Sequence, residues 1–184
     1  RDQLGRLRRQ LRNPAKETVV DDHPHLLRGA EQERAIQVAD SCHTFEQWAA
    51  TTYQMLTPDF PFSRGPEKIL VHGHCHQKAL TGTKDMVDLL NAIPGSTVTE
   101  LDTGCCGMAG SFGYEREHFE VSRAIGGQKL FPAIEAGRAR QAGAPDTCVV
   151  APGFSCRQQI AHFTAAAPVS PATLLESLLP DSDP

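Results

Sequence analysis

Four cysteines lie in short segments that also contain glycine, a setting typical of a metal or cluster site. The segments HGHC (72–75), TGCCG (103–107) and PGFSC (152–156) supply Cys75, Cys105, Cys106 and Cys156. Four thiolates are what tetrahedral zinc or a four-iron cluster requires. Spacing alone does not prove ligation, because no pair has the compact C-x-x-C of a zinc finger or simple ferredoxin. We expect the four cysteines to bind an iron–sulfur cluster or, in its absence, a zinc ion.

Glycines border these cysteines, and we expect Gly104, Gly107 and Gly153 to be cofactor-binding residues as well. Glycine lets the backbone approach a bound group closely or adopt turns with positive φ. Glycine on both sides of Cys105-Cys106 is poor core packing, which argues against ordinary buried thiols. A thiol–disulfide enzyme using this pair is a further alternative. It is disfavoured, because a bridge between adjacent cysteines is strained and no resolving motif is evident.

The other two cysteines are expected to have no role in the site. Cys148 lies in an apolar run with Val149 and Val150, and free cysteine often serves as a small buried apolar residue. Cys42-His43 falls in the middle of a stretch with helical periodicity and has no partner at ligand spacing. We interpret it as an ordinary core or surface pair.

Three histidines, His72, His74 and His76, flank Cys75 at alternate positions. They are candidates for a mixed Cys/His metal site, for a hydrogen bond to a sulfur, or for proton transfer beside a redox centre. The alternative is that they cap a strand end and are satisfied by the backbone. We favour His74 and His76 as catalytic candidates, because they border the cysteine. We expect Lys78 to be solvated. Stabilising the negative charge of a thiolate is the less favoured role for this side chain.

Composition narrows the classes of protein. The chain has 184 residues, 40% of them apolar and 22% charged, with a net charge of −4. This is typical of one globular domain, or a domain with a helical extension, and gives no reason to expect nucleic-acid binding. No run approaches the ~20 apolar residues that cross a bilayer, and we expect a cytoplasmic location, at most peripheral to the inner face of the membrane. In a reducing compartment cysteines indicate metal or redox chemistry rather than disulfides. A nucleotide site is not expected, because neither G-x-G-x-x-G nor a P-loop occurs.

The elements that must position the cysteines follow from apolar periodicity. Residues 1–60 read as helical, with a loop near 13–25 and one helical stretch over 31–56. Beyond residue 60, strands are predicted at 68–72, 97–101 and 147–151, each followed by a loop and a helix. The helical regions include 114–139, which Gly126-Gly127 should bend or divide, 157–163, and a last helix that begins at Ser170-Pro171. The pattern predicts an α/β fold: a small, largely parallel sheet flanked by helices, with a helical N-terminal extension (1–60) before the cysteine-rich α/β domain (61–184).

This topology should bring the cysteines together. In a parallel sheet the carboxyl ends of neighbouring strands lie along one edge, so the three loops become neighbours. Each loop is also expected to lead directly into a helix, where the dipole and free N–H groups lower the pKa of a thiol. The thiolate is the form that binds metal.

With these motifs, the chain resembles the cysteine-rich CCG domain found in heterodisulfide reductase and in the glycolate oxidase iron–sulfur subunit. It is most similar to the C-terminal region of large FAD- and iron–sulfur-containing D-lactate or D-2-hydroxyacid dehydrogenases. The matching motifs are HGHCHQKALTGTKD (72–85), LDTGCCGMAGSFGYE (101–115) and APGFSCRQQI (151–160), within a resemblance that covers residues 66–180. The opening RDQL resembles the segment after a first cysteine-rich half, so we expect a piece of a longer polypeptide.

The resemblance implies an electron-relay role. An FAD domain elsewhere takes two electrons from a 2-hydroxy acid, and iron–sulfur centres pass them singly to a quinone or a carrier protein. By position, Cys75, Cys105, Cys106 and Cys156 match the ligands. The fuller family pattern ends in C-x-x-C, and Gly153 occupies the first of those positions. Four ligands rather than five favour a [4Fe–4S] cluster or zinc over the non-cubane cluster of heterodisulfide reductase. The alternative function is a structural or docking module that binds zinc and has no redox role.

Overall fold

The computed structural model describes residues 28–56, 62–138 and 146–180, and their core is a parallel sheet. Its strands are β1 (Lys68–Val71), β2 (Thr97–Glu100) and β3 (Thr147–Val150). β1 lies in the centre, in the order β2-β1-β3, and pairs in parallel with both neighbours. Each predicted strand is confirmed to within one residue. The three strands share short runs that contain β-branched residues and are bounded by turn signals, which favours strands.

The structure describes seven α-helices besides this sheet. They are α3 (Ala30–Ser41), α4 (Phe45–Leu56), α5 (Cys75–Leu80), α6 (Lys84–Asn91), α7 (Phe119–Gly137), α8 (Phe154–Phe163) and α9 (Pro171–Ser177), with short 3-10 turns η1 (Phe112–Tyr114) and η2 (Arg116–His118). The start of α9 is as predicted: Ser170 Oγ accepts from the backbone N–H of Thr173 at 3.1 Å, and Pro171 fills the first turn.

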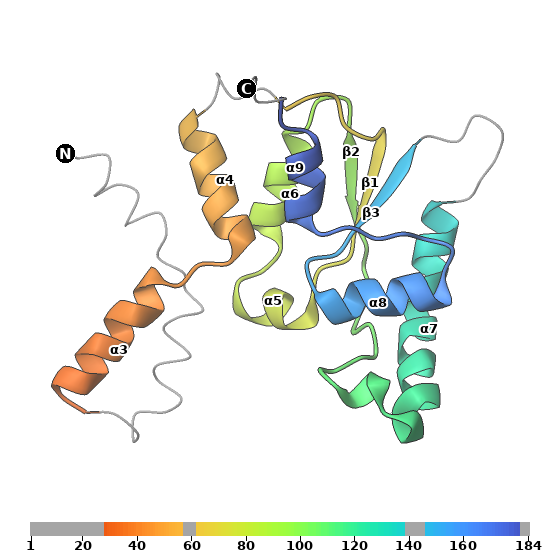
Figure 1. Ribbon diagram of the computed structural model, residues 1–184, viewed down its shortest axis with the longest axis horizontal. Coiled ribbons are helices and arrows are strands. Elements are labelled where there is room, and N and C mark those ends of the chain that lie inside the picture. The colour runs from red at the N-terminus through yellow and green to blue at the C-terminus, as the bar shows by residue number, and fades with distance from the viewer. Residues whose placement is uncertain (1–27, 57–61, 139–145, 181–184) are drawn as a thin grey trace.

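The helices lie on both faces of the sheet, α4, α6 and α9 on one and α7 and α8 on the other (Figure 1). Alternation along β1 explains this division, because successive side chains of a strand point to opposite faces. Ile69 and Val71 pack with α6 and α9, whereas Leu70 packs with α7 and α8. The prediction of an α/β fold with a small parallel sheet flanked by helices is confirmed.

Two helix predictions were wrong. The stretch 31–56 is two helices, because Thr44 and Gln47 form a capping box that begins α4 anew: each backbone N–H donates to the side chain of the other residue, at 3.0 and 3.2 Å. Cys42-His43 therefore lies between helices rather than within one. The region 114–139 begins as η1 and η2, and α7 then runs unbroken through Gly126 and Gly127 instead of being divided there.

The two described helices of the N-terminal region relate differently to the core. None of the residues of α3 is buried, whereas α4 contributes Ala50 to the core beside α6 and α9. Residues 1–27, with the expected opening helix and the expected loop near 13–25, lie outside the described residues. The division near residue 60 stays a prediction. None of the helices described here combines the length and apolar character needed to cross a bilayer.

Candidate metal centre

The four cysteines come from the ends of all three strands. Cys75 is the first residue of α5, and Cys156 lies in the first turn of α8. Cys105 and Cys106 follow β2 in a loop, and a further stretch of loop separates Cys106 from η1 before α7 begins. The expectation that every cysteine would sit at a helix start was therefore wrong for this pair, because the chain makes two 3-10 turns before it becomes α-helical.

The structure brings the four sulfurs into interaction with one another. The thiols of Cys106 and Cys156 are hydrogen-bonded, as are those of Cys105 and Cys75. Cys156 also experiences the charges of Cys75 and Cys105. Cys106 and Cys156 are buried, at 3% and 1% exposure, Cys105 is half-buried and Cys75 is exposed. Four thiols thus form one cluster that opens to solvent at Cys75.

The thiols of this cluster differ in acidity. The hydrogen bond from Cys156 lowers the pKa of Cys106 well below its ordinary value, with His72 and the backbone N–H of Met108 contributing. The same hydrogen bond, together with burial, raises the pKa of Cys156. Burial raises the pKa of Cys105, against a hydrogen bond from Gly107 N–H to its sulfur at 3.3 Å. The start of helix α8, which by itself would lower the pKa of the Cys156 thiol, is therefore not the dominant effect on that pKa.

Hydrogen bonds hold the first two loops together. His72 N–H donates to Val150 O at 2.9 Å, which extends the pairing of β1 with β3. Its Nδ1 lies 2.8 Å from Oγ1 of Thr103, in the loop after β2. Lys78 of α5 donates to Thr103 O at 2.9 Å. Lys78 thus braces two loops, instead of being simply solvated or paired with a thiolate.

The third loop and the wall behind the cysteines are fixed in the same way. Arg157 donates to the carbonyl oxygens of Ala151 and Pro152 at 2.8 and 2.7 Å. Gln159 of α8 donates to Oγ of Ser122 in α7 at 2.9 Å, with both residues buried. The helix that carries Cys156 is therefore tied to the helix against which the Cys105-Cys106 loop packs.

The three glycines have different surroundings. Gly107 has φ +99° and lies against the backbone carbonyl of Ser122, so a side chain is excluded. A Cβ at Gly153 would lie 2.5 Å from Cδ2 of His74 and 3.0 Å from Sγ of Cys156. A Cβ at Gly104 would have nothing within 4 Å among the described residues. Their role as cofactor-binding residues stays a prediction.

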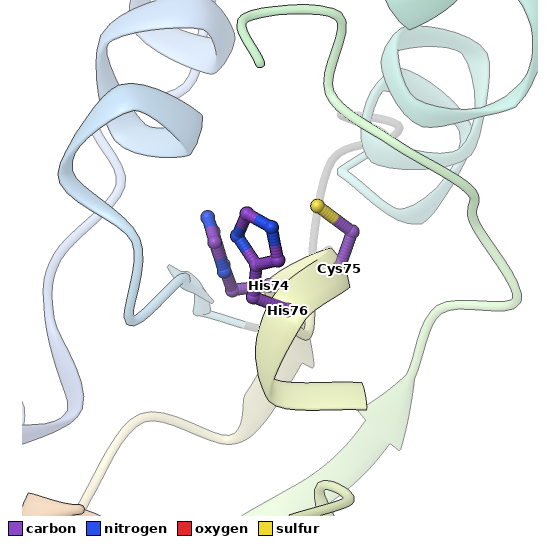
Figure 2. Close-up of side chains that lie close together, drawn as sticks. All are labelled: His74, Cys75 and His76. Atoms are coloured by element: carbon purple, nitrogen blue, oxygen red, sulfur yellow. The ribbon is translucent and has the colours of Figure 1, made fainter. Parts of the chain in front are cut away.

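His74 and His76 lie beside Cys75 at the start of α5 (Figure 2). One ligand atom from each of the three residues can be chosen so that all lie within 4.8 Å of one another. The two imidazole rings have centroids 5.4 Å apart. Burial, then His76, lowers the pKa of His74, which favours the neutral ring that binds metal. This arrangement is a second set of potential metal ligands, and it shares Cys75 with the thiol cluster.

His72 has a more direct relation to the thiols than its place in the sequence suggested. It is fully buried, and its Nε2 is a buried nitrogen with no hydrogen-bond partner among the residues described. The available signal was strand alternation: His72 follows Leu70 by two positions and so faces the layer that contains Cys106 and Cys156.

The remaining cysteines lie elsewhere, as expected. Cys148 packs against the core on the α6 and α9 face, and burial raises its pKa to about 11. Cys42 is exposed between α3 and α4. Neither is involved in the interactions that join the four clustered thiols.

Comparison with known proteins relates the chain to dehydrogenases. It is 36% identical over 119 residues to one subunit of the anaerobic glycerol-3-phosphate dehydrogenase of Escherichia coli (strain K12), covering 65% of this chain. It is 32% identical over 88 residues to the D-2-hydroxyglutarate dehydrogenase of Pantoea ananatis, covering 47% of this chain. The corresponding enzyme of Pseudomonas putida is also 32% identical, over 101 residues and 54% of this chain.

These relatives are much longer than the matched region. The alignment covers 28% of the glycerol-3-phosphate dehydrogenase subunit and 8% and 9% of the two D-2-hydroxyglutarate dehydrogenases. No family model matches the chain. No solved structure matches it either.

Proposed function

We propose that this chain is the electron-transfer domain of a flavin-dependent D-2-hydroxyacid dehydrogenase of the D-lactate type. In this proposal Cys75, Cys105, Cys106 and Cys156 hold a [4Fe–4S] cluster. The observation that carries the proposal is the interaction of four thiols from three strand-end loops. Two kinds of relative support the redox assignment, because glycerol 3-phosphate and D-2-hydroxyglutarate, the compounds in their names, both lose two electrons at an alcohol carbon.

The residues present fit a thiolate-bound cluster. The donor set is four sulfurs, and iron–sulfur clusters are held by cysteine thiolates. Nε2 of His72 lies beside Cys106 and has no hydrogen-bond partner among the described residues. A thiolate that holds a cluster at Cys106 would give this nitrogen an acceptor. The space beside Gly153 is filled by His74 and Cys156, which supports four thiolates rather than five.

Each residue then has a role that its surroundings support. When bound, the cluster supplies one-electron oxidation and reduction. Buried Cys106 and Cys156 anchor it on the sheet side, with Met108, 2% exposed, among the apolar residues that exclude water. Cys75 lies on the exposed side, where a redox partner approaches. His74 and His76 at that rim are the proposed acid–base residues, and Gly104, Gly107 and Gly153 shape the loops.

The wider assembly is part of the same proposal. FAD sits in another domain or subunit, and a quinone or a carrier protein accepts the electrons. One relative is by name a single subunit of its dehydrogenase, which supports a partner subunit here. We place the protein in the cytoplasm or peripherally on the inner face of the membrane. Residues 61–184 are the proposed cluster-binding CCG domain, and 1–60 the proposed remainder of a preceding half, of which α4 packs on the sheet of that domain.

The test is iron and acid-labile sulfide in protein that is purified and reconstituted without oxygen. We expect about four of each per chain, with broad absorption near about 400 nm. Cys106→Ala should lose most of the iron, whereas Cys148→Ala should retain it, because Cys148 lies outside the thiol cluster. Circular dichroism of both variants checks that they are folded. Wild-type protein that stays colourless and free of iron would contradict the proposal.

One observation favours the second candidate function, a zinc-binding structural or docking module. Imidazole and thiolate are the usual zinc ligands, and His74, Cys75 and His76 can offer three such atoms within 4.8 Å. In this case the chain binds one zinc ion per molecule, unfolds on chelation and takes up no iron. Zinc bound with equal affinity by wild type and His74→Ala would exclude the nitrogen of His74 from that site.

A further inference from the structure

His72 occupies a position from which it can act on the thiol cluster without being a ligand. Its backbone N–H is bonded to Val150 O at 2.9 Å, and its side chain is 0% exposed. Its Nδ1 is held at 2.8 Å from Thr103 Oγ1. The ring is thus fixed between the carboxyl ends of all three strands, and its rotation is restricted by burial.

The second ring nitrogen is left to face the cysteines. Nε2 has atom exposure near zero and no hydrogen-bond partner within the described part of the chain. Buried nitrogens are rarely left unpaired, because a buried donor or acceptor that loses its bond to water must find a partner in the protein. His72 follows Leu70 by two positions, so strand alternation directs its ring to the buried layer that contains Cys106 and Cys156. Of these two thiols, Cys106 is the one on which His72 acts. The thiol of Cys106 is therefore the group that Nε2 can serve.

The hydrogen-bond inventory decides which partner donates. A thiolate that binds iron has no proton, so the sulfur can only accept. Nε2 must then carry the hydrogen. In the neutral ring this requires the hydroxyl of Thr103 to donate to Nδ1. In the protonated ring, Thr103 accepts from Nδ1 and turns its hydrogen to Leu101 O, 3.5 Å away. Both arrangements place an N–H on the sulfur side.

We infer that His72 donates its Nε2–H to Sγ of Cys106 and thereby raises the reduction potential of the cluster that this cysteine helps to hold. The inference rests on the proposed function and deepens it. A hydrogen bond to a cluster sulfur stabilises the more negative, reduced state, which makes reduction easier. The other two histidines are placed differently: His76 is exposed, and His74 is half-buried with its ring on Gly153, where the charge of Cys106 also acts on it.

The experiment measures the midpoint potential of the reconstituted 184-residue chain, in wild type and in matched variants. His72→Asn places its amide where Nδ1 was and leaves nothing at Nε2, whereas His72→Gln can keep an N–H near Nε2. We expect His72→Asn to lower the midpoint potential by about 59 mV or more. For one electron this is a tenfold change in the ratio of reduced to oxidised cluster. His72→Gln should recover most of this shift. His162→Asn, exposed on the same helix as Cys156, should leave the potential unchanged.

Two outcomes for the His72 variants overturn the inference directly, and a third, for Thr103→Val, applies in one case. One is a His72→Asn protein with wild-type iron content and an unchanged potential. The other is loss of iron from His72→Gln as well, which would show that the residue is structural. If only His72→Asn loses iron, its potential cannot be compared with that of wild type. Thr103→Val is then the variant that tests the inference, because it removes the hydroxyl that orients the His72 ring. Its potential must then fall, and an unchanged value contradicts the inference. Wild-type protein without iron would instead contradict the proposed function, before any potential is measured.

Discussion

The clustered thiols differ in their exposure to solvent, and this difference should determine which of them reacts with molecules from solution. Cys106 and Cys156 share a hydrogen bond in a buried setting, while Cys75 is exposed. Thiolate character and exposure together control the reactivity of cysteine. Oxidants in solution should therefore reach the site through Cys75. The buried pair is protected by the layer that contains α7 and α8.

Cys148 gives a prediction about pH. Burial, with Asp146 as a second cause, raises its pKa from about 9 to about 11 in the folded chain. Because the folded-state pKa is the raised one, the stability contributed by the neutral thiol is complete below pH 9. It is lost as the pH rises from about 9 to about 11. We expect urea unfolding of the metal-free, reduced protein to show this decline, and Cys148→Ala to show a smaller one. Equal slopes in the two proteins would contradict it.

Gly153 gives a prediction about the fifth cysteine of the family pattern. A Cβ there would meet the His74 ring at 2.5 Å and Cys156 Sγ at 3.0 Å. We expect Gly153→Cys to lower the free energy of unfolding by about 1–3 kcal/mol, the usual cost of overpacking. Adding His74→Ala should recover part of this loss, because it removes the closer contact. Denaturant titration of both proteins is the measurement. If Gly153→Cys alone were as stable as wild type, the His74 ring would move aside without cost and the prediction would be wrong.

At the scale of elements, α7 supports the Cys105-Cys106 loop through a glycine. A Cβ at Gly126 would meet the ring of Phe131 and lie 2.8 Å from Cys106 O, whereas at Gly127 the nearest atom is 3.9 Å away. Alanine is the better helix former by about 1 kcal/mol. We therefore expect Gly127→Ala to be neutral or stabilising. Gly126→Ala should be destabilising by about 1–3 kcal/mol, with reduced iron content, because it displaces the loop.

Thermal and denaturant unfolding of the two proteins, with iron analysis after reconstitution, test this pair. The two substitutions are chemically identical and adjacent, so helix propensity cancels in the comparison. Equal stability of the two variants would mean that the loop adapts to the added methyl group.

Local sequence encodes some elements more clearly than others. β1 could be placed because Ile69, Leu70 and Val71 form a run with no polar interruption, β2 and β3 because they contain β-branched residues between turns, and the convergence of the three loops follows from parallel pairing. The break before α4 was missed, although Thr44 and Gln47 have the capping-box spacing. Apolar periodicity alone does not register a break that local side-chain hydrogen bonds produce.

Within the site, the sequence predicted that the loops of the four cysteines would meet, but it ranked the histidines by adjacency. Proximity along the chain favoured His74 and His76. Strand alternation instead directs His72 to the layer that contains Cys106. Its bond to Thr103 is a contact between residues 31 positions apart, and no local pattern encodes it. The 3-10 turns after Cys106 escaped prediction as well, because short glycine-rich segments carry little periodic signal.

The whole molecule raises the question of where its folding unit begins. Ala50 of α4 is 5% exposed and packs in the same core cluster as residues of α6 and α9, and Tyr53 stacks on Phe62 with ring centroids 5.2 Å apart. α3, in contrast, buries none of its residues. These contacts indicate that α4 folds with the sheet, although it precedes the predicted boundary near residue 60.

Two truncations test this. A chain that begins at Cys42 lacks α3 and keeps the capping box of α4, so we expect its free energy of unfolding to stay within about 0.5 kcal/mol of the full chain. A chain that begins at Phe62 also lacks α4 and uncovers core side chains such as Leu89 and Leu175. It should lose about 2 kcal/mol or more, the scale of exposing one large apolar side chain. Urea unfolding of the three proteins at one pH provides the comparison. If the chain that begins at Phe62 retained full stability, α4 would belong with the preceding segment and the boundary at residue 60 would hold.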